Sequence, residues 1–95
     1  MNLPEGWVLV DSETATRFEA ELRRELPVDH ELRGRQLRAL ARRADRDEVL
    51  FVSVGAGSSV YSVHLTWSVE SDPRWPRTKA YDGLDDFSVH WASND

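Results

Sequence analysis

The residue pair best suited to chemistry in this chain is a histidine and a threonine, two positions apart on one predicted strand. Residues 60–68 alternate between apolar and polar side chains with period two, which is typical of a β-strand with one buried face. His64 and Thr66 fall on the polar face, so an imidazole and a hydroxyl would point the same way. Such a pair could offer an acid or base and a hydrogen-bond donor to one phosphate ester.

A single His-x-Thr motif is nevertheless weak support for an enzyme. The two-histidine phosphoesterases use this motif twice, and this chain has no second copy, since His30 is followed by Glu-Leu-Arg and His90 by Trp-Ala-Ser. No nucleophile with a base, no paired carboxylates at a recognisable spacing and no cofactor motif stand out. We therefore predict no catalytic residue and no cofactor, and we interpret His64 as a strand histidine that is hydrogen-bonded to a neighbour.

Metal binding and phosphate binding are disfavoured by spacing. The histidines follow neither the His-x-His nor the His-x-x-x-His pattern, and the chain has no cysteine. The Gly-Ala-Gly at residues 55–57 precedes a predicted strand, whereas a phosphate-binding loop needs a helix whose free amides point at the anion. The sequence therefore predicts no metal site, and it predicts a hairpin turn at residues 55–59.

A cluster of arginines makes the middle of the chain basic within an acidic protein. Residues 31–47 contain six arginines and three acids, although the whole chain has a net charge of −5 and a pI near 5.1. A nucleic-acid binder usually shows a basic face and a high pI, so a protein partner is favoured over DNA or RNA. The arginines form either a solvated strand edge or a patch for anions and acidic partners. Arg38 and Arg42 are its candidate binding residues.

A helix is predicted before this cluster. Asp11 and Ser12 are both candidate N-caps, and Pro27 cannot continue a helix interior. Between them, Glu19 and Arg23 could pair on the outer surface. Apolar residues recur every three or four positions and would face a core: Ala15, Phe18, Leu22 and Leu26.

The strand assignments after this helix differ in how clear they are. Residues 48–54 are rich in valine and phenylalanine and predict a strand, and residues 44–47 would form a hairpin connection into it. Residues 36–43 fit a helical stripe, yet a strand here would give residues 48–54 the second neighbour that their apolar character requires. At the N-terminus, the apolar run at residues 6–10 is either an edge strand or a lead-in to the helix.

Several motifs resemble a group of small, uncharacterised bacterial proteins, and together they span most of the chain. They are Glu-Leu-Arg-Arg-Glu-Leu at residues 21–26, His30 with Leu32 and Gly34, Asp-Glu-Val-Leu-Phe at 47–51, Val-His-Leu-Thr-Trp at 63–67, and Pro-Arg-Trp-Pro at 73–76. The resemblance implies that residues 36–43 form a strand. It carries no activity, cofactor or catalytic residue.

The C-terminal part predicts a stiff loop and a second helix. Two prolines bracket Trp75, which either folds back onto the sheet or stands at the surface as a contact. From Asp82 onward, apolar residues recur at helical spacing after two acids in the first turn. We therefore predict one α+β domain over residues 1–95: helix, three-stranded antiparallel meander and helix, with a possible short N-terminal edge strand.

The two faces of the predicted sheet suggest where a partner would bind. We assign Leu65 and Trp67 to the face under the first helix, together with Tyr61, Val63, Leu50, Val52 and Val54. The other face would then carry Val49, Phe51 and Val60 beside His64 and Thr66. This second face is too apolar for water and too polar for a full core, so either the C-terminal helix covers it with Leu84, Phe87 and Trp91 or it is a contact surface. Because one short helix can hide only part of the sheet, we predict a contact with a second copy or with another protein through Phe51, His64 and Trp75.

The sequence therefore favours a small non-catalytic protein-binding domain, of the immunity, antitoxin or inhibitor kind, acting through an acidic surface and one sheet face. The alternative is binding or hydrolysis of a small molecule or phosphate ester at His64 and Thr66 with nearby arginines. No apolar run approaches the roughly 20 residues of a membrane span, and no secretory signal stands out. Together with the lack of cysteine, this fits a cytoplasmic protein.

Overall fold

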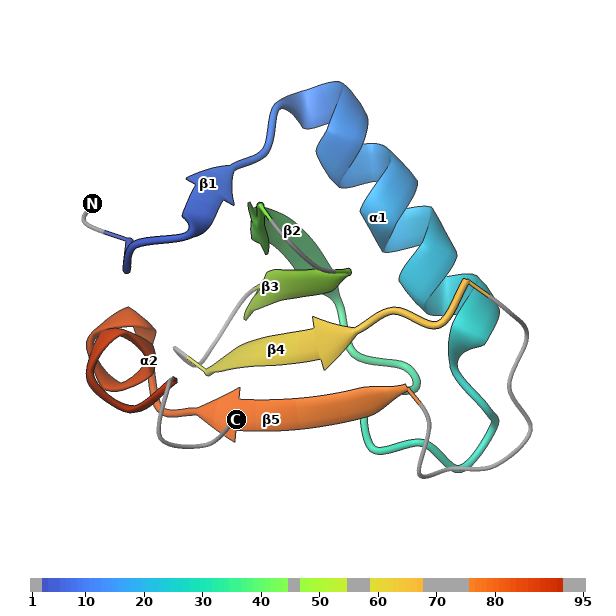
Figure 1. Cartoon of the computed structure of the whole chain (residues 1–95). Coiled ribbons are helices and arrows are strands. Elements are labelled where there is room, and N and C mark those ends of the chain that lie inside the picture. Colours follow the sequence, from blue (N-terminus) through green and yellow to red (C-terminus); the bar gives the residue numbers. More distant parts are fainter. Residues whose placement is uncertain (1–2, 45–46, 55–58, 68–75, 92–95) are drawn as a thin grey trace.

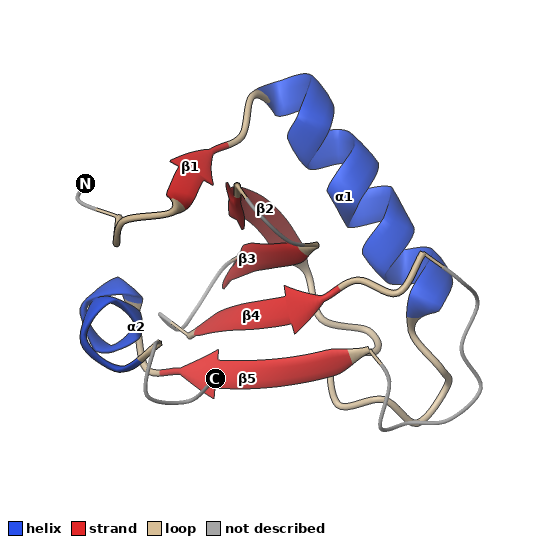
Figure 2. Ribbon diagram, viewed as in Figure 1, coloured by secondary structure: helices blue, strands red, loops and turns tan. Residues whose placement is uncertain are grey.

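The structure, a computed structural model, describes residues 3–44, 47–54, 59–67 and 76–91. It is an α+β fold in which an antiparallel sheet has the strand order β1-β2-β3-β4-β5 (Figure 1, Figure 2). The elements in chain order are β1 (Trp7–Leu9), α1 (Ser12–Glu25), β2 (Leu37–Arg43), β3 (Glu48–Ser53), β4 (Val60–His64), β5 (Arg77–Tyr81) and α2 (Leu84–His90). The predicted class and both helices are confirmed.

The sheet is larger than the predicted three-stranded meander because it has a strand at each edge. The N-terminal run forms β1, which pairs with the end of β2. The last strand, β5, pairs with β4 along its whole length. Its sequence, Arg-Thr-Lys-Ala-Tyr, contains one large apolar side chain, so the period-two pattern that identifies a half-buried strand is missing there.

Helix α1 begins and ends where its capping residues predict. The Thr14 N–H donates to Oδ1 of Asp11 over 2.7 Å, and this bond lowers the pKa of the Asp11 carboxyl. The predicted ion pair between Glu19 and Arg23 is replaced by contacts with the sheet. Oε2 of Glu19 accepts the Ala39 N–H over 3.0 Å and lies 3.6 Å from Nε of Arg38. The glutamate thus ties α1 to β2.

The expected strand at residues 36–43 is confirmed as β2, and it contains a bulge. The pairing with β3 shifts between Ala39 and Ala41, so Leu40 is an extra residue on this strand. Ala39 packs into the core under α1, whereas Ala41 belongs to the core on the other side of the sheet. Odd-numbered residues of β2 therefore face the layer of α1 before the bulge and the opposite layer after it.

Two hydrophobic cores lie on opposite faces of the sheet, each under one helix. Figure 1 shows α1 along one side of the sheet and α2 on the other side. The core under α1 consists of Phe18, Leu22, Leu26, Leu32, Leu37, Val49, Phe51, Tyr61, Val63 and Leu65. The core under α2 consists of Trp7, Ala41, Leu50, Val60, Tyr81 and Phe87.

The predicted faces of β3 are wrong. Phe51 lies opposite Tyr61 and Val49 lies opposite Val63, and residues directly opposite each other in an antiparallel pair share a face. Both β3 residues are therefore buried under α1, while Leu50 packs under α2. The relative phase of two strands depends on their register, which the alternation within each strand does not reveal.

The predicted strand at residues 60–68 is shorter in the structure and ends at His64. Leu65 is buried under α1 as predicted, but Trp67 is 44% exposed. Its backbone has φ 60°, the left-handed region that side chains other than glycine rarely adopt. The indole still reaches the helix, since its ring centroid lies 6.2 Å from that of Phe18.

Aromatic rings fasten α2 to the sheet. Phe87 has edge-to-face contacts with Trp7 and Tyr81, with centroids 5.1 Å and 5.2 Å apart. The Arg43 guanidinium lies 4.7 Å from the ring centroid of Trp91, which extends this cluster to the end of β2. Within the described ranges, neither helix has the length and apolar character that crossing a membrane requires.

Candidate functional site

A buried carboxyl group at the end of α1 holds the segment that follows β4. Glu25 is fully buried. Its Oε1 accepts the Thr66 N–H over 2.8 Å and the Thr66 hydroxyl over 3.0 Å, and its Oε2 accepts the Trp67 N–H over 2.7 Å. These bonds fix Trp67 in its left-handed conformation. Strained backbone held by surrounding groups is common at functional sites, which directs attention to the surface around this tryptophan.

The proton of Glu25 is held by its surroundings. Burial raises the pKa of the Glu25 carboxyl to about 7, and a hydrogen bond with Glu21 contributes to the rise, whereas the donors from Thr66 and Trp67 oppose it. Glu21 is itself fixed, because Arg24 donates to both of its carboxylate oxygens over 3.0 Å and 2.8 Å. The support of Trp67 is therefore a buried carboxyl group with a raised pKa, hydrogen-bonded to a second carboxyl group that an arginine fixes in place.

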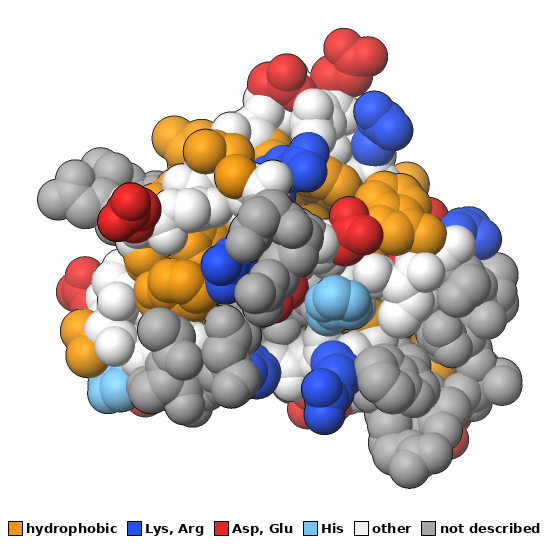
Figure 3. Space-filling model, viewed as in Figure 1, with side chains coloured by type: hydrophobic (Ala, Val, Ile, Leu, Met, Phe, Trp, Pro, Cys, Tyr) orange, Lys and Arg blue, Asp and Glu red, His pale blue; other side chains and the backbone are white. Residues whose placement is uncertain are grey.

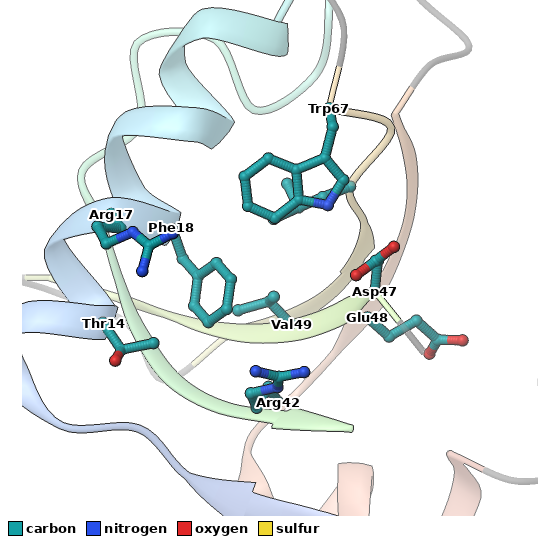
Figure 4. Close-up of a pocket in the computed structure, with 9 residues that line it drawn as sticks. Thr14, Arg17, Phe18, Arg42, Asp47, Glu48, Val49 and Trp67 are labelled. Carbon is teal, nitrogen blue, oxygen red and sulfur yellow. The ribbon is translucent and has the colours of Figure 1, made fainter. Parts of the chain in front are cut away.

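The indole of Trp67 covers one side of a hollow of about 210 Å³, which we call the Trp67 pocket (Figure 4). Phe18, Val49 and Leu65 provide its apolar wall, and Trp67 closes it from above in the view of Figure 4. The polar residues that line it are Thr14, Arg17, Arg42, Asp47 and Glu48. Its volume is below the roughly 300–1,000 Å³ of pockets for drug-sized ligands, so it suits a smaller molecule or one side chain of a partner.

Charges of both signs surround this pocket. The Arg42 guanidinium lies 5.9 Å from the centroid of the Phe18 ring, and its Nε donates to the Arg43 carbonyl over 3.4 Å. Among the described residues, Arg17, Arg42 and Asp47 have no ion-pair partner. In Figure 4, Arg42 and Asp47 approach the hollow from different sides. The pocket can therefore offer an anion site and a cation site to the same ligand.

A second hollow lies on the opposite flank of α1, and we call it the arginine groove. Its volume is about 610 Å³. The apolar residues that line it are Leu22, Leu26, Leu32, Leu37 and Val54, and the polar ones are Glu19, Arg23, Arg33, Arg35, Gln36 and Arg38. Four of the lining side chains are thus cationic and one is anionic, around a leucine floor.

Backbone contacts fix two of these arginines in place. Nη1 of Arg33 donates to the Leu26 carbonyl at the end of α1 over 2.6 Å. Nε of Arg35 donates to the Glu31 carbonyl over 3.2 Å, and its guanidinium lies 5.9 Å from the Tyr61 ring centroid. The Arg38 side chain is 71% exposed, and its Nε lies 3.6 Å from Oε2 of Glu19. The groove therefore combines arginines held by backbone carbonyls with a more exposed arginine beside Glu19.

Outside these two hollows the surface is mixed. Figure 3 shows acidic and basic side chains interspersed over one face of the molecule, with hydrophobic side chains reaching the surface between them. The exposed large hydrophobic residues include Val8, Leu9 and Val28 as well as Trp67. The arginine groove differs from this face because its charges are largely of one sign.

The structure separates the candidate residues that the sequence suggests. Phe51 is completely buried under α1 and offers nothing to a partner. His64 is exposed at the end of β4, opposite Glu48 and Arg77. Trp75 lies outside the described residues. Arg38 lines the arginine groove and Arg42 lines the Trp67 pocket, so the two arginines belong to different sites.

The His-x-Thr arrangement does not form. Because β4 ends at His64, the next alternate residue no longer follows the strand, and the Thr66 hydroxyl donates to Glu25 instead. His30 is buried and structural: its Nδ1 accepts the Leu32 N–H over 3.1 Å, and its Nε2 donates to the Pro76 carbonyl over 3.0 Å. In the described part of the chain, no group of three potential ligand residues could hold a metal ion.

Glu25 was not identified from the sequence, although its position on the apolar face of the helix could have indicated it. Glu25 is seven residues after Phe18, which places it on the same face of α1 as the apolar stripe. A carboxyl group on a core-facing position needs hydrogen-bond donors, and those donors mark where the helix meets another segment. The Trp67 pocket itself could not be found this way, because its residues come from four separate segments.

Comparisons with protein-family models, with curated proteins and with solved structures find no match to this chain.

Proposed function

We propose that this chain is a non-catalytic protein-binding domain whose arginine groove takes an acidic, partly apolar segment of another protein. The observation that carries the proposal is the composition of the groove, in which arginines surround a floor of leucines. Arginine binds carboxylates through paired N–H donors. The apolar lining takes small apolar groups out of water mainly at Val54, which is 45% exposed, because the leucines beneath are at most 9% exposed. A segment that alternates acidic and apolar residues satisfies both parts of this surface.

The net charge of the chain makes the proposed binding selective among acidic proteins. The chain has a net charge of −5, so it repels acidic proteins at long range and attracts them only near the groove. A partner that carries its acids in one short segment within a neutral or basic body avoids this repulsion. The attraction is screened by salt, because the Debye length at physiological ionic strength is about 8 Å.

The arginine groove replaces the sheet face as the proposed contact. A contact through Phe51 would require the core under α1 to open, since this side chain has no exposed surface. The proposal keeps a protein as partner, and it moves the binding surface from β3 and β4 to the flank of α1 beside β2.

Binding of a defined peptide tests the proposal. The probe is Ac-Asp-Val-Glu-Leu-Asp-Val-Glu-NH₂, titrated into the ¹⁵N-labelled full chain and followed by amide chemical shifts. We expect shifts confined to the residues that line the groove. The amide analogue Ac-Asn-Val-Gln-Leu-Asn-Val-Gln-NH₂ should bind at least tenfold more weakly, because it cannot form charge-assisted bonds with the arginines.

Two arginines of α1 provide a matched pair of variants. Arg23 lines the groove and Arg17 lines the Trp67 pocket, and both are exposed. Arg23→Gln should weaken peptide binding about two- to five-fold, as expected for one exposed charge pair, and Arg17→Gln should leave it unchanged. Equal effects of the two variants, or tight binding of the amide analogue, would count against the groove. Binding of anionic phospholipid vesicles or an oligonucleotide, but not of the peptide, would refute a protein partner.

The Trp67 pocket supports a second candidate function, the binding of a small molecule. The specific observation is that Arg42 and Asp47 line one small hollow without pairing with each other. An amino acid with an apolar side chain has a carboxylate and an ammonium group to match them and an apolar group for Phe18 and Trp67. A titration with L-leucine and with N-acetyl-L-leucine tests this candidate: the indole N–H signal of Trp67 should shift with the first and not with the second. Equal shifts with both compounds would exclude a role for Asp47.

A further inference from the structure

One edge of β2 is left uncovered by its neighbouring strand. β1 pairs with β2 at Ala41, Arg42 and Arg43. The Val10 N–H donates to the Leu40 carbonyl over 3.1 Å, and the chain then leaves the sheet to enter α1. The first part of β2, residues 37–39, therefore extends beyond the end of β1.

The direction of the backbone groups along this edge follows from the pairing with β3. The Val54 N–H donates to the Gln36 carbonyl, whereas the Ser53 N–H donates to the Ser59 carbonyl on the other side of β3. Backbone groups of successive strand residues point alternately to the two neighbouring strands. The N–H and C=O groups of Leu37 consequently point away from β3, toward the uncovered edge.

Glu19 confirms the outward direction of these backbone groups and covers part of the β2 edge. The Ala39 N–H follows the same alternation and points outward, where it donates to Oε2 of Glu19. A carboxylate from α1 thus takes one outward donor of the edge. Within the described residues, no other strand pairs with Leu37 on the outward side, away from β3.

The uncovered edge lies within the arginine groove. Leu37 and Arg38 line it from β2, and Leu22 and Arg23 line it from α1. The groove volume of about 610 Å³ has room for a short extended segment, since a strand advances about 3.3 Å per residue. The leucine floor, the arginine side chains and the outward backbone groups therefore surround the same space.

We propose that the acidic segment binds as an added β-strand on residues 37–39 of β2, in line with β1; this inference rests on the proposed function. The backbone of the ligand exchanges hydrogen bonds with Leu37. Its alternate side chains point to opposite faces, so apolar ones meet the leucine floor and acidic ones meet Arg23 and Arg38. Backbone bonds supply affinity for any extended chain, and the groove selects the alternating acidic and apolar pattern.

A scan of N-methylated peptides tests the binding mode. Each residue of Ac-Asp-Val-Glu-Leu-Asp-Val-Glu-NH₂ is N-methylated in turn, and the affinity for the full chain is measured by calorimetry. An added strand turns every second N–H toward β2, so methylation at alternating central positions should weaken binding at least about tenfold, and methylation at the positions between them should change it less than about twofold. The amide hydrogen of Leu37 should also exchange more slowly in the complex.

The outcomes separate this inference from the proposed function. Uniform effects of N-methylation together with unchanged exchange at Leu37 would refute strand addition, even if the parent peptide binds in the groove. Loss of affinity on N-methylation at positions spaced by three and four residues would indicate that the peptide binds as a helix, and this result would also refute strand addition. Failure of the unmethylated peptide to bind would instead overturn the proposed function.

Discussion

Replacing Glu25 by glutamine should change how the stability of this domain depends on pH. Glutamine keeps the shape of the side chain and an oxygen for the Thr66 N–H, but it cannot titrate. The unfolded chain loses the proton of Glu25 near pH 4.5, whereas burial raises the pKa in the fold to about 7. The folded state therefore holds an additional proton in this interval. The stabilisation by that proton is complete below about pH 4.5 and is lost as the pH rises through about 7.

The magnitude follows from the two pKa values. A tenfold change in proton affinity is worth about 1.4 kcal/mol, so the difference between 4.5 and about 7 corresponds to about 3 kcal/mol, most of which falls between about pH 5 and about pH 8. Over that interval the wild-type chain should lose this free energy of unfolding through Glu25, and the Glu25→Gln variant should not. Relative to the wild type, the free energy of unfolding of the variant should therefore rise by about 3 kcal/mol across this pH interval.

Urea unfolding at a series of pH values measures this difference directly, because the linear dependence on denaturant gives the free energy of unfolding at each pH. Glu13→Gln, at an exposed position in the first turn of the same helix, is the matched control. It shows how much pH dependence any removed carboxyl group causes. If the two variants differ from the wild type by amounts that stay constant across the pH series, the raised pKa of the buried Glu25 carboxyl is wrong.

Four further substitutions test the two cores and two exposed side chains by chemical unfolding. Phe51→Ala should cost about 3–5 kcal/mol because this ring is wholly buried, whereas Trp67→Ala should cost only about 1 kcal/mol because its indole is nearly half exposed; equal costs would refute the assigned faces. Phe87→Ala should cost about 3–5 kcal/mol through the loss of its contacts with Trp7 and Tyr81, and a smaller effect would show that α2 adds little. His64→Gln should change the free energy of unfolding by less than about 0.5 kcal/mol, since this residue is exposed; a larger cost would reveal a structural bond.

The local parts of this fold could be predicted from the sequence, because they depend on residues close together in the chain. Asp11 and Pro27 mark the ends of α1, and the strands β3 and β4 follow from their apolar patterns. The bulge at Leu40 explains why β2 was ambiguous. By adding one residue it brings apolar side chains to spacings of three and four, which resemble a helical stripe.

Contacts between residues far apart in the chain could not be predicted, because they depend on the register between strands and on where the chain turns. The phase between β3 and β4 places Phe51 in the core rather than beside His64. The chain leaves the strand direction after His64, and this takes Thr66 to Glu25. The two candidate arginines share one strand, but the bulge and the diagonal course of α1 place Arg38 and Arg42 in separate hollows.

The sheet that separates the two hydrophobic cores also divides the molecule into unequal cooperative units. The larger core joins α1 to three strands, whereas the core under α2 depends on one fully buried helix residue, Phe87. Opening of the α2 layer leaves the larger core under α1 buried and the hydrogen bonds between the central strands intact, so it costs less than global unfolding. Amide hydrogens of α2 then exchange through a low-energy partly open state, while those of β3 and β4 report the full stability of the fold.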